Sequence, residues 1–76
     1  MDFKRFAVKE MNQPRYMLAG DVGHAFWVMI PLNATFFTTD QDALNSIEIY
    51  KRADPKAFVG KQLEVVELKI TVQVIA

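Results

Sequence analysis

The chain has 76 residues, of which 51% are hydrophobic, and nine basic and nine acidic residues give a formal net charge of zero. A chain of this length holds one hydrophobic core, so we expect a single domain over residues 1–76. The lack of cysteine excludes a disulfide framework and a thiolate zinc site. The balanced charge lacks the basic stripe of nucleic-acid binders, so no nucleic-acid partner is expected.

The first two predicted strands lie near the amino terminus. Residues 3–10 alternate loosely between apolar and polar side chains, which is the period of a half-buried strand. A turn at residues 12–14 leads to a second strand over residues 15–19. Two glycines in residues 20–23 can take the positive φ of a hairpin loop, so a third strand is expected next.

The third predicted strand, residues 24–30, is apolar on both faces. Both faces therefore need cover, and one helix can cover only one of them. The sequence leaves open whether the row of Trp27 or the row of Phe26 lies under the helix. Pro31 ends the strand because it cannot donate a ladder hydrogen bond.

The helix is predicted from Thr39, as N-cap with Asp42 three residues on, to Ala53. Helical spacing places Ile49 on the side away from the apolar stripe. Asp54 and Pro55 then start a single turn over residues 56–59. The residues expected to face the core are Ala43, Leu44, Ile47 and Tyr50 of the helix and Phe58 of the turn.

The last strand is predicted over residues 63–75, where apolar and polar side chains alternate cleanly. It is longer than the other predicted strands, so part of it has no partner within the chain, or a bulge bends it to serve both ends of one small sheet. We expect it to run parallel to the first or third strand, beside the first at the sheet edge. The fold class is therefore α+β, with a small, mostly antiparallel sheet in the order β-β-β-α-β and one helix on one face.

No catalytic residue, metal site or cofactor is predicted. His24 could pair with Asp21, but one histidine and one carboxylate are too few ligands for zinc, and Ser46 lies within the helix without a base nearby. The glycines of residues 20–23 superficially match the GxxG clamp of RNA-binding KH domains, yet they join strands and lack basic flanks. Ligand binding at His24 and RNA binding stay minor alternatives.

Two groups of side chains are candidates for contact with other macromolecules. Aromatic residues, methionine and arginine are enriched at interface hot spots, and an apolar edge strand can pair with another chain. The same side chains could simply pack inward or against a homodimer partner. The partner-binding candidates are Arg15, Trp27, Met29, Phe36 and Ile49, and the self-association candidates are Ile70, Val72 and Val74.

Residues 34–43, Ala-Thr-Phe-Phe-Thr-Thr-Asp-Gln-Asp-Ala, and residues 63–67, Leu-Glu-Val-Val-Glu, resemble a pattern in small phage and prophage proteins. In those proteins an A-x-x-F-x-[ST] segment precedes a capped helix and a VVE strand follows it. The resemblance implies a binder that disables a host enzyme, and it supplies no catalytic residues.

Together these patterns predict a non-enzymatic protein-binding module, acting through an exposed sheet edge and an aromatic patch on a bacterial host protein. The alternative is a self-assembling homodimer paired through its last strand. No signal peptide or apolar run of membrane-spanning length is apparent, so we expect a cytoplasmic protein without a membrane partner, in the host cell if phage-encoded.

Overall fold

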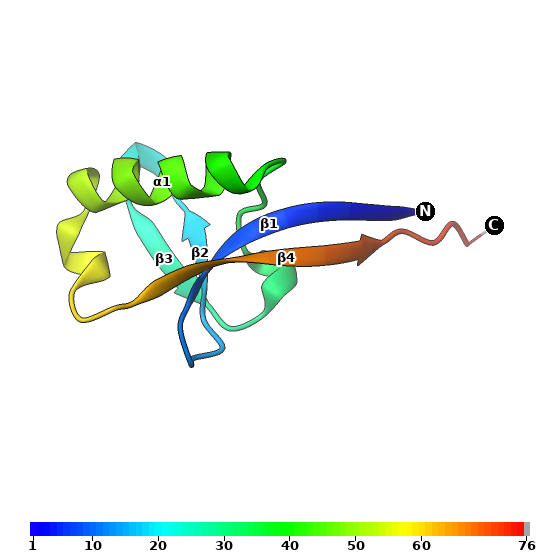
Figure 1. The fold of residues 1–76 in the computed structure, drawn as a ribbon, viewed down its shortest axis with the longest axis horizontal. Helices are drawn as coiled ribbons and strands as arrows, with labels where there is room; N and C mark the ends of the chain where they lie inside the picture. Colours follow the sequence, from blue (N-terminus) through cyan, green and yellow to red (C-terminus); the bar gives the residue numbers. More distant parts are fainter. Residues whose placement is uncertain (76) are drawn as a thin grey trace.

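The computed structural model describes residues 1–75, and within them the chain forms one four-stranded antiparallel sheet and one α-helix (Figure 1). This confirms the predicted α+β class, the element order and the packing of one helix on one face. The strands are β1 (Asp2–Glu10), β2 (Tyr16–Ala19), β3 (Ala25–Val28) and β4 (Leu63–Thr71), the helix is α1 (Asp40–Ala53), and short 3-10 turns are η1 (Asp21–Gly23), η2 (Pro31–Asn33) and η3 (Pro55–Phe58).

The sheet, in the order β3-β2-β1-β4, divides into two ribbons. β1 and β4 pair along their whole length, whereas β1 and β2 pair only where Lys9 lies opposite Tyr16. The segment before α1 enters the fork between the ribbons. Its Phe37 exchanges two backbone hydrogen bonds with Phe6 of β1, at 2.8 and 2.9 Å, and the Thr35 amide donates to the β2 carbonyl of Met17 at 3.0 Å. This segment therefore satisfies backbone groups that the diverging strands leave unpaired.

β4 lies beside β1 at the sheet edge as predicted, but the prediction that it runs parallel to β1 or β3 is wrong. The connection from β3 to β4 contains two successive segments that run in opposite directions, where a single helix was expected. Residues 34–38 first run antiparallel to β1, as the Phe6 to Phe37 bridge shows, and α1 then returns toward the start of β3. β4 consequently enters opposite Glu10 and runs antiparallel to β1.

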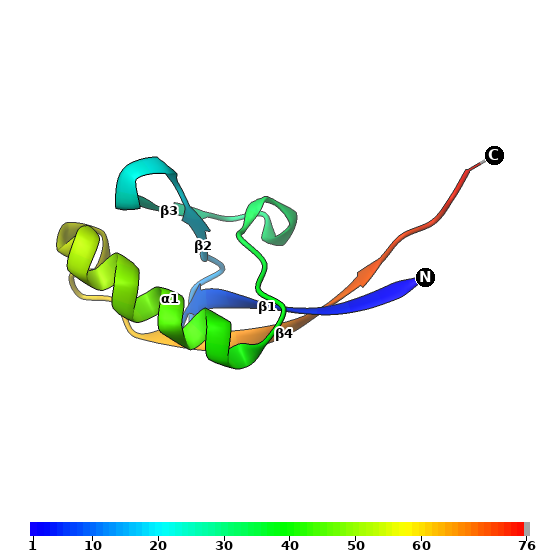
Figure 2. The same ribbon diagram turned by 90° about the horizontal axis from the view of Figure 1, so that it is seen from above.

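The predicted strand over residues 63–75 is also too long, because β4 ends at Thr71. β1 and β4 each have nine residues, so every β4 residue has a partner, and the Val72 amide adds one further bond to the carbonyl of Met1 at 2.8 Å. The amino-terminal half of β1 pairs with β4 but not with β2. Together with the end of β4 it forms a ribbon that projects past α1 and gives the molecule its 45 Å length (Figures 1 and 2).

α1 begins as predicted, since the Thr39 hydroxyl accepts the Asp42 amide at 3.1 Å. Its buried residues are Ala43 and Ser46, with Ile47 and Tyr50 partly buried beside them. The prediction that Leu44 faces the core is wrong, because this residue is 48% exposed. Ser46 is tolerated in its place because its hydroxyl donates to the carbonyl of Ala43 at 2.6 Å.

The core resolves which face of β3 lies under the helix. Trp27, opposite Met17, packs against the buried cluster, whereas Phe26 on the other face is half exposed. The row of Trp27 is therefore the covered one. The buried cluster consists of Val8, Met17, Ala25, Ala43 and Phe58.

The turn after α1 forms one residue earlier than the predicted residues 56–59 and buries Phe58 as predicted, but the Asp54 side chain does not cap it. Its carboxylate instead accepts the amide of Ala25 at 3.2 Å, which joins the end of α1 to the start of β3. β3 itself is shorter than the predicted residues 24–30, because the chain bends at Met29 and Ile30 into η2.

Val22 of η1 has a left-handed backbone, with φ 52° and ψ 34°, and its side chain is 91% exposed. A β-branched residue is strained there and gains no burial in return. We expect Val22→Asn to raise the free energy of unfolding by about 1 kcal/mol, because asparagine tolerates this conformation. Urea denaturation measures the gain. Val59→Asn is the control, since exposed Val59 has an ordinary φ of −60°; an equal gain there would refute the strain.

Candidate functional site

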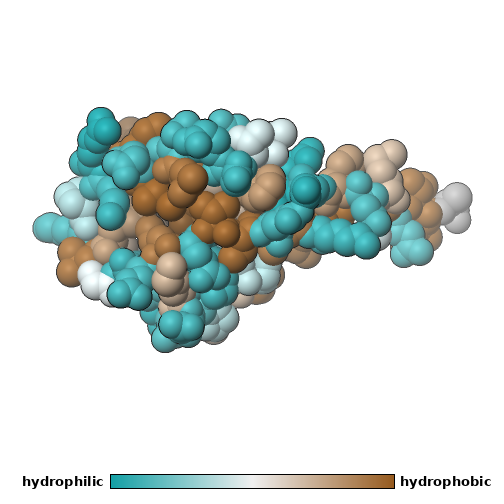
Figure 3. All heavy atoms as spheres, in the orientation of Figure 1, coloured by the Kyte–Doolittle hydropathy of each residue, from teal (hydrophilic) through white to brown (hydrophobic). Residues whose placement is uncertain are grey.

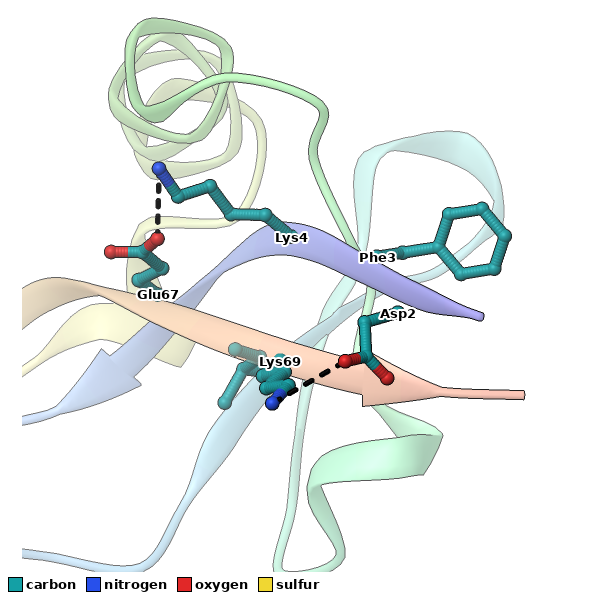
Figure 4. A pocket seen from close by; sticks show the side chains of 6 residues that line it. Asp2, Phe3, Lys4, Glu67 and Lys69 are labelled. Carbon is teal, nitrogen blue, oxygen red and sulfur yellow. Dashed lines mark ion pairs between the residues drawn. The ribbon is translucent and has the colours of Figure 1, made fainter. Parts of the chain in front are cut away.

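The projecting ribbon has a charged face on the side of α1. Cross-strand register places Phe6, Val8 and Val65 on this side, where they pack against the core below the helix. Farther along the ribbon the same face carries two ion pairs, Lys4 Nζ to Glu67 Oε1 at 3.0 Å and Lys69 Nζ to Asp2 Oδ2 at 3.4 Å (Figure 4). These exposed pairs keep this face hydrated and each contributes little to stability.

The opposite face of the ribbon is apolar. In β4, Val66, Leu68 and Ile70 alternate with the charged positions and therefore point away from α1. Phe3 lies opposite Ile70 on this face, and the Arg5 guanidinium lies 5.5 Å from the centre of its ring. The near side of the ribbon in Figure 3 is hydrophilic, while apolar atoms gather toward its tip. α1 does not cover this face, whose residues Val66, Leu68 and Ile70 are partly buried.

A groove runs between η2 and the projecting half of β4. We call it the ribbon groove; its apolar walls are Leu32 and Phe36 on one side and Leu68 and Ile70 on the other, and its remaining lining residues are Pro31, Lys69 and Thr71. Leu32 is 71% exposed although it is a large apolar side chain. Phe36 is held there because its neighbour Phe37 is bonded to β1. The groove thus presents apolar side chains from two rigidly connected segments beside a strand edge.

The predicted partner-binding residues do not form one patch. Phe36 lines the ribbon groove, and Phe36 and Ile49 both line a second open hollow beside α1. Trp27 is largely committed to the fold, since its Nε1 donates to the carbonyl of Ala57 at 2.9 Å. Arg15 lies in the turn after β1, 3.7 Å from the Glu10 carboxylate, and Met29 is exposed at the end of β3.

The predicted self-association residues differ in position. Ile70 belongs to β4 and lines the ribbon groove, whereas Val72 and Val74 lie beyond the last residue of the strand. Both valines are exposed. Ile70 and Val72 therefore both lie on the paired part of the ribbon, because Val72 exchanges backbone hydrogen bonds with Met1, whereas Val74 lies beyond it.

His24 does not pair with the side chain of Asp21. Its Nδ1 lies 3.6 Å from Oδ2 of Asp54, and its own amide donates to the Asp21 carbonyl at 3.2 Å. Asp54 is at the same time bonded to the amide of Ala25. This is a link between η1 and the end of α1, and no group of three possible metal ligands gathers among residues 1–75.

Of the four apolar wall residues of the ribbon groove, sequence reasoning missed two, Leu32 and Leu68. Leu68 had a signal, because it belongs to the apolar row of β4, but the sequence did not show which face of the sheet the helix covers. Leu32 had no such signal, because an isolated leucine after a proline belongs to no helical or strand periodicity. Their approach depends on the two-segment connection between β3 and β4.

No protein-family model matches this chain, and comparison with curated proteins and with solved structures found no similar one. The resemblance to small phage proteins stays a prediction. No helix within residues 1–75 is both long enough and apolar enough to cross a membrane. The functional argument accordingly depends on the geometry of the ribbon and its groove.

Proposed function

We propose that this chain is a non-enzymatic protein-binding module that holds an apolar segment of its partner in the ribbon groove. The observation that carries the proposal is the groove itself, which is open and is lined by exposed Leu32 and by partly buried Phe36, Leu68 and Ile70. Exposed apolar surface is typical of protein interaction sites, and Leu32 of this groove is 71% exposed.

The neighbouring strand edges support the same function. Within residues 1–75, β4 is an edge strand, and β1 ahead of Phe6 has no strand neighbour on the side away from β4. A partner segment bound in the groove can add backbone hydrogen bonds at the open edge of β1. The resemblance to phage proteins that disable host enzymes makes a bacterial protein the first partner to test.

A matched pair of variants tests the proposal. Leu32→Glu places a charge in the groove, whereas Val59→Glu places the same charge on an equally exposed valine beside η3, at the other end of the molecule. We expect the wild type and Val59→Glu to retain one stoichiometric protein from a bacterial lysate and Leu32→Glu to retain at least about tenfold less, the loss expected when a charge is buried unpaired at an apolar contact. Quantitative mass spectrometry of the captured protein measures the ratio.

The result is interpretable because both residues are exposed and neither belongs to the core. Circular dichroism should show that all three proteins are folded. Equal capture by the two variants, or no captured protein with the wild type, would refute the groove as the binding site.

A further inference from the structure

The outer edge of β4 presents unpaired backbone groups at alternate residues. Phe6 exchanges its backbone hydrogen bonds with Phe37, so its amide and carbonyl point away from β4. Its partner Glu67 must then direct its own amide and carbonyl outward, because directly opposite residues of an antiparallel pair are either both bonded to each other or both turned away. Lys69 and Thr71 follow with the same orientation.

Charged side chains stand at these outward positions. Lys69 lies directly opposite Lys4 of β1, which is a like-charge pair. The diagonal contacts of Glu67 with Lys4 and of Asp2 with Lys69 offset it (Figure 4). Lysine and other charges protect an edge strand against indiscriminate pairing. A partner strand must therefore place an acidic residue opposite Lys69 and a basic one opposite Glu67.

The β4 strand of another copy fulfils this requirement in one register. We infer that a second copy of this chain pairs antiparallel with β4 about a two-fold axis at Leu68, so that Glu67 of each copy faces Lys69 of the other. An axis at Glu67 or Lys69 would set like charges against each other. An axis at Val66 or Ile70 would leave both charges opposite uncharged residues.

Backbone geometry selects the same register. Leu68 directs its amide and carbonyl toward β1, so the central pair of leucines is of the non-hydrogen-bonded type. In the flanking pairs of Glu67 with Lys69, and of Val65 with Thr71, the backbone amide and carbonyl of both residues point toward the other copy. The two-fold axis makes each pair occur twice, so four pairs exchange two hydrogen bonds each, about eight across the junction.

Side-chain packing is consistent with this pairing. Val66 lies opposite Ile70 of the second copy, so the apolar face continues across the junction from one ribbon to the other. Both helices remain on one face of the joined sheet, and both ribbon grooves open on the other. The pairing uses the edge of β4 and is independent of the proposed partner in the groove.

Charge reversal tests the pairing. We expect the wild type to dimerise with rising concentration in the micromolar range, and Glu67→Lys and Lys69→Glu each to dimerise about tenfold or more weakly, because each faces like charges twice. The double variant with both reversals restores opposite charges and should dimerise like the wild type. An equimolar mixture of the two single variants should form a heterodimer. Sedimentation velocity measures all four.

Cysteine crosslinking tests the register, because the chain has no cysteine of its own. Under mild oxidation we expect Leu68→Cys to form a disulfide-linked dimer, since directly opposite non-hydrogen-bonded residues lie within disulfide reach. Ile70→Cys alone should not crosslink, whereas its mixture with Val66→Cys should. A monomeric wild type throughout the concentration range, a dimer insensitive to the single reversals, or crosslinking of Ile70→Cys alone would overturn the inference. Loss of the groove partner would not affect it.

Discussion

Phe58→Ala is expected to lower the free energy of unfolding by about 3–5 kcal/mol, the range for truncating a buried phenylalanine. Phe58 is 5% exposed and meets Trp27 edge to face, with ring centroids 5.6 Å apart. Trp27 is itself held by Ala57 of the same turn and lies 5.1 Å below the Lys61 ammonium. Truncation therefore leaves a cavity and loosens the contact between η3 and β3 together.

The loss is large for this chain, because 76 residues are expected to provide only about 4–11 kcal/mol of stability in all. Urea denaturation followed by fluorescence reads the effect directly, since Trp27 is the only tryptophan in the sequence. Phe26→Ala is the matched control. Phe26 neighbours Trp27 but is half exposed on the other face of β3, so its truncation should cost about 1 kcal/mol. Equal losses would contradict the assignment of the buried face.

The sequence predicted the elements whose signals are local. The Thr39 cap, the helix to Ala53 and the turn that buries Phe58 each follow from a few neighbouring residues, and all three are present. The first and last strands were found for the same reason, since alternation over eight or more residues is a strong pattern. These elements fix the fold class before any long-range contact is considered.

What could not be predicted depends on contacts between distant segments. The direction of β4 follows from the additional segment of residues 34–38, which runs antiparallel to β1. No sequence pattern in this segment predicts the backbone hydrogen bonds between Phe37 and Phe6. The exposure of Leu44 follows from the exact placement of α1, which buries Ser46 instead. The first error is one of chain connection, and the second arises where packing overrides a local period.

The candidate site shows the same division. The apolar row of β4 is evident in the sequence, but its meaning depends on which face the helix covers. Because α1 packs over Val65, the row of Val66, Leu68 and Ile70 lies on the face away from the helix and is only partly buried, which is why we propose it as a contact surface. Phe36 was predicted as a contact residue, and it lies beside this row because Phe37 is tied to β1.

Gly23→Ala is expected to lower the free energy of unfolding by about 2–3 kcal/mol, from two separate causes. Gly23 has a φ of 78°, a left-handed conformation that costs an alanine about 1 kcal/mol or more. A Cβ at this position would also lie 2.8 Å from the Cβ of Ala53, which is closer than side-chain atoms pack. The site is where η1 meets the end of α1, beside the contacts of Asp54 with His24 and Ala25.

Gly60→Ala separates the two causes. Gly60 has a φ of 72°, but a Cβ there would meet no atom within 4 Å, so only the backbone cost of about 1 kcal/mol should appear. Thermal or urea denaturation of the two variants gives the difference. In a protein that already carries Ala53→Gly, the close contact is absent. Gly23→Ala should then lower the free energy of unfolding only by the backbone cost, about as much as Gly60→Ala does. If Gly23→Ala cost no more than Gly60→Ala, the close approach of η1 to α1 would be wrong, and the junction that aligns the two ribbons would have to lie elsewhere.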